Sequence, residues 1–125
     1  MIYQYQTPVL VKSFQVDTSA TPGQVVTFSG VNAGNLAVAA SGTYQVGVVY
    51  SGGTDENNYA PVLLMGVVSV QSDGSGTIAA GDKVAVSSNG QVRATTLSGD
   101  NLVVLGVALN SAPATAGALF DVLIK

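Results

Sequence analysis

The sequence predicts an all-β fold, a single compact β-barrel or β-sandwich-like domain of short antiparallel strands. Short Val-rich runs alternate with clusters of Gly, Ser, Asn, Asp and Pro, a pattern typical of sandwiches and barrels. No window shows the 3.6-residue apolar period of an amphipathic helix. The length of 125 residues fits one domain.

Nine strands are expected, each a run rich in Val, Leu, Ile or Tyr that ends at residues favoured in turns. The turns have the sequences TPGQ, SGGTDENNYAP, SDGSG, SNGQ, SGDN and NSAPATAG. In chain order the expected strands are Val9–Val16, Val25–Ser29, Leu36–Ala40, Tyr44–Tyr50, Val62–Val70, Lys83–Ser87, Val92–Thr95, Leu102–Leu109 and Leu119–Ile124.

The sixth and seventh strands are expected to form a hairpin around the sequence SSNGQ. A two-residue Asn89-Gly90 loop would place Val86 opposite Arg93. A three-residue loop, Ser88–Gly90, instead pairs Val86 with Val92 and keeps the apolar side chains on one face. Because Gly90 can adopt the left-handed conformation that closes such a loop, we favour the three-residue loop.

Asp82 is the most reactive-looking residue of this region, and we interpret it as structural. It follows Gly81 at the start of the sixth strand, where an Asp side chain usually accepts backbone hydrogen bonds and fixes a turn. Its neighbour Lys83 is expected on the outward face of the hairpin together with Arg93. The predicted structural turn residues are Gly81, Asp82, Asn89 and Gly90.

Composition excludes several functional classes. The chain has no Cys and no His, which removes disulfides, thiolate metal sites and the commonest general base. The net charge is −3 and the four basic residues are scattered, so we expect no nucleic-acid partner. The apolar runs are about half as long as a membrane-spanning helix, so we expect no membrane partner. The sequence MIYQYQTPVL does not resemble a signal peptide, which predicts synthesis in the cytoplasm.

No motif supports catalysis, and we expect neither an enzyme nor a bound cofactor or metal. The Lys residues lack the Ser-x-x-Lys spacing that would activate a serine. The run Asp55–Asn58 does not have the alternate ligand spacing of a calcium loop. Five tyrosines could stack on sugars, which leaves carbohydrate binding as one alternative function, although the absence of Trp counts against it.

The chain contains a faint internal repeat. TPGQVVTF (Thr21–Phe28) is similar to AAGDKVAV (Ala79–Val86), and YQVGVVYSG (Tyr44–Gly52) is similar to VVLGVALNS (Val103–Ser111). Because both pairs occur in the same order at nearly the same offset, they suggest two similar β units around a shared core. Chance similarity between Val-rich strands is the competing explanation.

The C-terminal half resembles the capsid cement, or head-decoration, proteins of tailed bacteriophages. The similarity comprises an ordered series of five short motifs and spans about half the chain, whereas the N-terminal half departs from the family pattern. The motifs are Gly66-Val67, Ile78–Val84 (IAAGDKV), Gly90–Val92 (GQV), Leu105–Leu109 (LGVAL) and Val122–Ile124.

The resemblance implies a non-enzymatic β-domain, often a homotrimer, that binds the major capsid protein on the outside of an expanded head and stabilises it. Its low content of charged residues, 9%, suits a surface covered by partners. The localisation implied is the capsid exterior of the virion. Another all-β virion part, such as a tail or fibre module, is the second alternative.

Residues 1–16 are expected to form either an N-terminal extended arm or the first strand, with the decoration domain over 17–125. The alternation at Met1–Gln6 indicates extended backbone, and Pro8 disfavours a central position in a sheet. An extended arm can bind a neighbour by adding a strand to it. The predicted capsid- or subunit-contact residues are Ile2, Tyr3, Tyr5 and Pro8.

Overall fold

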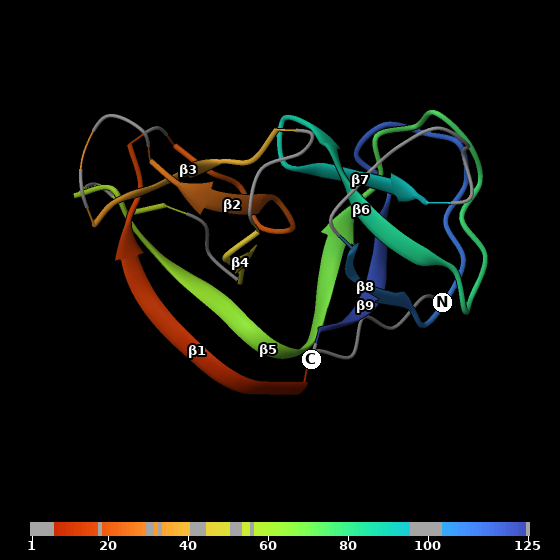
Figure 1. Cartoon of the computed structure of the whole chain (residues 1–125), viewed down its shortest axis with the longest axis horizontal. Coiled ribbons are helices and arrows are strands. Elements are labelled where there is room, and N and C mark those ends of the chain that lie inside the picture. The colour runs from red at the N-terminus through yellow and green to blue at the C-terminus, as the bar shows by residue number, and fades with distance from the viewer. Residues whose placement is uncertain are drawn as a thin grey trace.

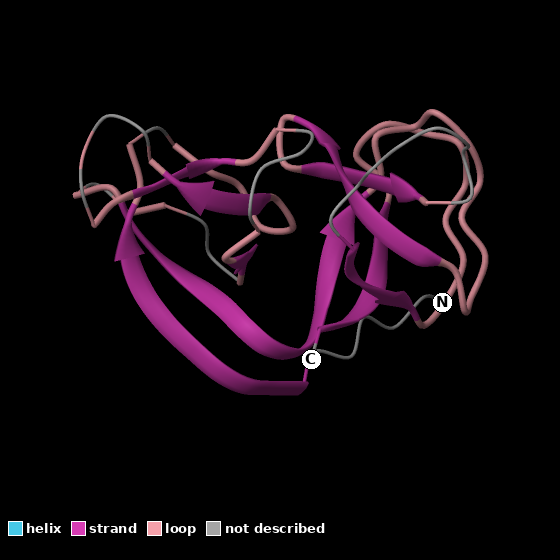
Figure 2. Cartoon of the chain, viewed as in Figure 1, coloured by secondary structure: helices cyan, strands magenta, loops and turns pink. Residues whose placement is uncertain are grey.

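The computed structural model describes residues 7–17, 19–29, 32, 34–40, 45–50, 54–55, 57–95 and 104–124, and all regular structure in them is β-strand (Figure 2). The strands are β1 (Thr7–Gln15), β2 (Val25–Phe28), β3 (Leu36–Val38), β4 (Gly47–Val49), β5 (Tyr59–Gln71), β6 (Lys83–Ser88), β7 (Gln91–Ala94), β8 (Val104–Ala108) and β9 (Leu119–Ile124). Each overlaps its expected strand, and the all-β prediction is confirmed.

The strands form one curled antiparallel sheet in the order β3-β2-β4-β5-β9-β8-β6-β7, with β1 paired to β5 outside this path. Strand β5 spans 13 residues, longer than expected, and is the axis of the fold. Its first part pairs with β4 and β1, and its second part pairs with β9. Figure 1 shows β1 and β5 running side by side and then β5 turning upward beside β9.

The sheet therefore consists of two units that share β5. The N-terminal unit contains β1, β2, β3, β4 and the first half of β5, and the C-terminal unit contains the second half of β5 with β6, β7, β8 and β9. Each unit curls until its end strands meet at one parallel bridge. The bridge joins Val16 to Leu36 in the first unit and Ser72 to Val92 in the second.

The two units match in their backbone hydrogen bonds, which confirms the internal repeat. Gly23 N–H donates to Val49 O at 3.0 Å, and the corresponding Gly81 N–H donates to Ala108 O at 2.7 Å. The two glycines have nearly the same φ, 91° and 92°. Three further bonds of the N-terminal unit have a counterpart in the C-terminal unit. Asp17 N–H to Leu36 O corresponds to Asp73 N–H to Val92 O. Val49 N–H to Gln24 O corresponds to Ala108 N–H to Asp82 O, and Ala39 N–H to Val25 O corresponds to Thr95 N–H to Lys83 O.

Each unit has its own hydrophobic cluster. The N-terminal cluster consists of Val16, Ala20, Val26, Leu36, Val49, Ala60 and Val62. The C-terminal cluster is larger, because it combines the matching residues of the second unit, such as Val84, Val122 and Phe120, with Val25, Ala39, Val48 and Leu63 of the first. The first unit thus contributes to two clusters at once.

Two glycines allow the closest strand approaches. A Cβ atom on Gly47 of β4 would lie 2.4 Å from Leu63 O of β5, and one on Gly106 of β8 would lie 2.2 Å from Leu123 O of β9. Real Cβ contacts are essentially never this short. The Gly-Val pair that recurs in the sequence is therefore a packing requirement of each unit.

Candidate functional site

The hairpin between β6 and β7 corrects one sequence prediction and confirms another. Asn89 and Gly90 both have positive φ, 50° and 68°, and form a two-residue turn with Ser88 opposite Gln91. The three-residue loop was therefore wrong. A bulge at Ser87 absorbs one residue, so that Val86 still pairs with Val92 and the predicted apolar register is confirmed.

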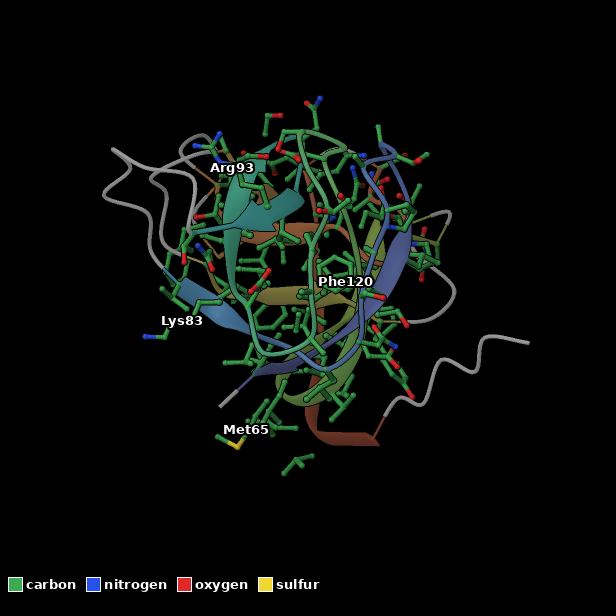
Figure 3. All side chains as sticks on the ribbon, turned by 90° about the vertical axis from the view of Figure 1, so that its right-hand side faces the viewer. Met65, Lys83, Arg93 and Phe120 are labelled. Carbon is green, nitrogen blue, oxygen red and sulfur yellow. The ribbon has the colours of Figure 1, made fainter. Side chains whose placement is uncertain are left out.

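The second face of this hairpin is less exposed than expected. Lys83 is exposed and projects away from the ribbon (Figure 3), and Arg93 is half-buried. Ala85, the Cα partner of Arg93, is fully buried. The expectation of an outward face therefore does not extend to Ala85, which lies between its cross-strand partners Arg93 of β7 and Val104 of β8.

The predicted turn residues lie where β6 begins and where the hairpin closes. Asp82 Oδ2 accepts the N–H of Ala79 at 2.9 Å, and the Asp82 N–H donates to Ala79 O at 3.0 Å. Gly90 has a further constraint, because a Cβ there would lie 2.8 Å from Val25 O in the other unit. The hairpin tip is therefore part of the contact between the two units.

Two aspartates hold corresponding turns in the two units. Asp17 Oδ2 accepts a hydrogen bond from the Ser29 hydroxyl, and Asp73 Oδ2 accepts one from the Ser87 hydroxyl at 2.5 Å. The bonds from Ser29, and then from Asn32 and Asn35, lower the pKa of Asp17.

The pKa of Asp73 is also lowered, although by an opposed set of effects. Burial acts to raise it, and this is the largest effect. The hydrogen bonds from Ser87 and Ser75, together with the charge of Arg93, outweigh burial. Both aspartates accept hydrogen bonds from the hairpin of their own unit, an arrangement that stabilises structure.

Strand β1 forms a margin of the sheet. Its Cα partners all lie in β5, and Pro8 is opposite Gly66 at its start. Ile2, Tyr3 and Tyr5 lie outside the described residues. The strand exposes three consecutive apolar side chains, Val9 at 70%, Leu10 at 50% and Val11 at 38%.

Two bulges, between Pro8 and Leu10 and between Leu10 and Val11, interrupt the pairing of β1 at this point. Met65 of β5 is opposite Leu10, is 43% exposed and projects outward at the margin of the molecule (Figure 3). Together Val9, Leu10, Val11 and Met65 form an apolar patch, called here the margin patch. Sequence reasoning missed it because a run of apolar residues usually indicates a buried strand.

The part of the chain that the structure describes contains no cluster of three His, Cys, Asp or Glu residues that could hold a metal. In the same residues no helix is long and apolar enough to cross a bilayer. Of the tyrosines, Tyr50 packs against the C-terminal cluster and Tyr59 is 47% exposed. Tyr44 lies outside the described residues. The margin patch is thus the best candidate for a binding surface.

Comparison with known families now adds to this geometry. The family model described as phage cement protein matches residues 11–124. The chain belongs to the phage cement protein family. It is accordingly a structural component of the virion that stabilises the capsid, as its resemblance to decoration proteins had suggested.

The fold of this cement protein is found in another phage head protein. A solved structure described as the head fiber gp8.5 N base in bacteriophage phi29 is 18% identical, with a TM-score of 0.66 over 93% of each chain. At this identity the match shows the shared fold. A search of curated proteins found no match.

Proposed function

We propose that this cement protein binds the major capsid protein on the outside of the expanded head through the margin patch and the segment that precedes β1. The exposure of Val9, Leu10 and Val11 on a marginal strand carries the proposal. Apolar side chains in this arrangement are typical of interaction sites, whereas a monomeric surface usually protects such an edge with charge.

The binding mode that we propose is strand addition. A marginal strand presents backbone N–H and C=O groups that a strand of the capsid protein can pair with, and alternate side chains then occupy pockets in the partner. Ile2, Tyr3 and Tyr5 would supply further anchors, since large apolar and aromatic side chains dominate binding energy at interfaces. Pro8 has no N–H to donate and would limit the pairing at its position.

We further propose that the bound protein is a homotrimer without catalytic activity. The low charged fraction of the sequence and the apolar groups exposed on several strands, including Phe28 at 64% and Val104 at 47%, support self-association. Among the described residues, Asp82 accepts a backbone hydrogen bond within its turn, and Asp17 and Asp73 accept serine hydroxyls from the hairpins of their units. That arrangement supports structural roles for them.

The test compares binding to empty expanded heads by co-sedimentation. Val9→Ser with Leu10→Ser should abolish or strongly weaken binding, and deletion of residues 1–6 should weaken it. Both changes leave the pairing of β1 with β5 in place. Tyr59→Ser is the matched control, because it removes a large side chain that is 47% exposed from the other end of the β1–β5 pair, opposite Gln15. Unchanged binding by both margin variants would refute the proposal, as would an equal loss in the control.

A second candidate function is suggested by the structural match to a head-fibre base. In that role this cement protein would anchor an extended structure on the head in addition to stabilising the shell. Electron microscopy of decorated heads separates the two functions. Compact knobs indicate a cement protein alone, whereas thin projections from each binding site indicate a fibre base.

A further inference from the structure

The contact between the two units uses two unlike faces. On the outside of the N-terminal unit, Val25, Val48 and Leu63 are aligned across β2, β4 and β5. All three are fully buried in the C-terminal cluster. This aligned set is called here the outer row. It is covered by the hairpin end of the other unit, so the contact is heterologous.

Backbone hydrogen bonds fix this contact, which we call the joint. The Val25 N–H donates to Gly90 O, and the Gly90 N–H donates to Ala39 O, both at 2.8 Å. At a second point the Gln71 N–H donates to Gly23 O at 3.0 Å. The joint therefore places the hairpin tip of one unit against the start of β2 in the other.

The C-terminal unit repeats the outer row but leaves it open. Lys83, Val107 and Leu123 occupy the places of Val25, Val48 and Leu63, as the pairing of β6, β8 and β9 shows. Lys83 is exposed, and Val107 and Leu123 are half-buried. Next to this row Leu109 is 46% exposed, whereas Tyr50 at the same place in the first unit packs against the C-terminal cluster.

The N-terminal unit has a hairpin at the corresponding place, with seven residues between Phe28 and Leu36 where the C-terminal hairpin has five between Val86 and Val92. Gly34 in this hairpin is exposed. Gly34, with φ of +85°, precedes β3 as Gly90 precedes β7. A Cβ on Gly90 would collide with Val25, but a Cβ on Gly34 would meet no atom of the described residues within 4 Å. The same contrast separates Gly23, which is crowded by Gln71 and Leu119, from Gly81, which has nothing within 4 Å.

The cluster behind that open end is also less well covered. Four apolar side chains of the N-terminal unit are half-buried, while the four at matching positions of the C-terminal unit are buried. The matched pairs, N-terminal residue first, are Phe14 and Val70, Val38 and Ala94, Val46 and Leu105, and Leu64 and Ile124. Since the C-terminal unit is sealed by the joint, the difference is what an unfilled joint would produce.

We propose that a second copy of this chain fills the open end, so that the joint is repeated between molecules. The outer row Lys83, Val107 and Leu123 of one copy packs against the hairpin end around Gly34 of the next. The Lys83 N–H of one copy donates to the Gly34 C=O of the next, as the Val25 N–H donates to the Gly90 C=O within the chain. The Gly34 N–H then donates to the Thr95 C=O, as the Gly90 N–H donates to the Ala39 C=O. This deepens the proposed self-association and rests on it.

A joint between unlike faces has a defined outcome. Repeated copy to copy, it closes into a ring if the rotation allows and otherwise continues as a filament. In a homotrimer the ring would contain six similar units, and the internal joint of each chain would alternate with the proposed joint between chains. The margin patch includes none of the residues of the outer row and none of the hairpin around Gly34.

The test uses engineered cysteines, which are unambiguous because the chain contains none. In the internal joint, a Cβ on Gly90 lies 3.0 Å from Gln24 Cβ, close to the roughly 3.5–4.5 Å that a disulfide requires. The matching positions in the proposed joint are Gly34 and Asp82. We therefore mix a tagged Gly34→Cys protein with an untagged Asp82→Cys protein and oxidise them, both free in solution and on empty heads.

The expected product is a disulfide-linked heterodimer in clear excess over either homodimer. Gly117→Cys replaces Gly34→Cys in the matched control, because Gly117 has almost the same φ, +84°, and equally open surroundings. Heterodimer at the control level in both settings overturns the inference. If the heads still bind the protein normally in that case, the joint is wrong and the proposed function stands.

A second variant tests the joint without cysteines. Lys83→Val gives the proposed joint a valine at the position that Val25 occupies in the internal joint. Burying a valine there should lower the concentration at the midpoint of self-association by at least about tenfold, measured by sedimentation. Arg93→Val, on the partner strand in the same unit, is the control. An unchanged midpoint for Lys83→Val contradicts the proposal.

Discussion

Asp17 and Asp73 show how a single residue type stabilises corresponding points of the two units. Each follows the end of a strand, and each accepts a serine hydroxyl from the hairpin of its own unit, Ser29 or Ser87. These bonds favour the ionised carboxylate, which is why both pKa values are lowered. Each ionised carboxylate thus holds the turn after its strand against the hairpin that contains the serine.

These two pKa values predict the response of the fold to acid. A carboxylate whose pKa is lowered by folding contributes stability above its unfolded pKa, and that contribution disappears as the pH falls through the native value. The melting temperature should therefore be level near neutral pH and decrease below about pH 4. Thermal unfolding followed by circular dichroism across this range measures the effect.

Replacement of the carboxylates provides the control for the acid response. Asp17→Asn with Asp73→Asn should lower the melting temperature at pH 7 and make its decrease below about pH 4 shallower. Asp55→Asn removes an exposed carboxylate that accepts the N–H groups of Asn57 and Tyr59. If all three proteins show the same acid response, the two aspartates are not its source.

Phe120 is a second residue with a predictable contribution. It is the largest fully buried side chain and belongs to the C-terminal cluster, and Figure 3 shows it enclosed by the strands. Phe120→Ala should reduce the free energy of unfolding by about 3–5 kcal/mol, through lost burial and the cavity left behind.

Urea denaturation measures the effect of Phe120→Ala. Phe28 is 64% exposed, so Phe28→Ala should change the free energy of unfolding by no more than about 0.5 kcal/mol. A small effect of Phe120→Ala would mean that the cluster collapses around the missing ring.

At the scale of the elements, the two Gly-Val strands should respond alike to substitution. Gly47→Ala and Gly106→Ala each force a Cβ against the backbone carbonyl of the adjacent strand. We expect each to cost roughly 1–3 kcal/mol of unfolding free energy, or more if the strands separate. Gly76→Ala is the control, since its Cβ would have nothing within 4 Å. A tolerated Gly106→Ala would show that β8 can move away from β9.

Much of this element pattern could be predicted from the sequence. The nine runs and the turn residues between them are local signals, and so is Asn89-Gly90. The length of β5 was not predictable, because Pro61 suggested a boundary where the strand in fact continues as the partner of β1. The bulge that restores the hairpin register was also missed, since it depends on pairing that only the folded sheet defines.

The candidate site was harder to predict than the strands. Pro8 was correctly placed away from the centre of the sheet, at the start of β1. The margin patch depends on which strand lies at an edge, and that is set by contacts between residues far apart in the sequence. The internal repeat was detectable as a faint sequence similarity, but its unlike contacting faces became visible only from the burial of Val25, Val48 and Leu63.

At the scale of the whole molecule, the shared strand predicts cooperative unfolding. Neither unit is complete without β5, and Val25, Val48 and Leu63 belong to the cluster of the other unit. Calorimetry should therefore show one transition with equal calorimetric and van't Hoff enthalpies. Phe120→Ala should shift that single transition rather than split it, and two resolved transitions would contradict this prediction.

The same transition should be insensitive to reductant and to EDTA. The chain has no Cys or His, and the described residues include no cluster suited to a metal. We expect the melting temperature to be the same within error with either reagent, compared with buffer alone. A sharp decrease with EDTA would reveal a metal whose ligands lie in other residues.

The 13-residue length of β5 has a mechanical consequence. Its first part is bonded along its length to β1 and its second part to β9. A pull along β5 would strain those hydrogen bonds together in shear instead of opening them one after another. Strand β5 therefore links the two units mechanically, and the force needed to separate them increases with the number of hydrogen bonds that must break at once.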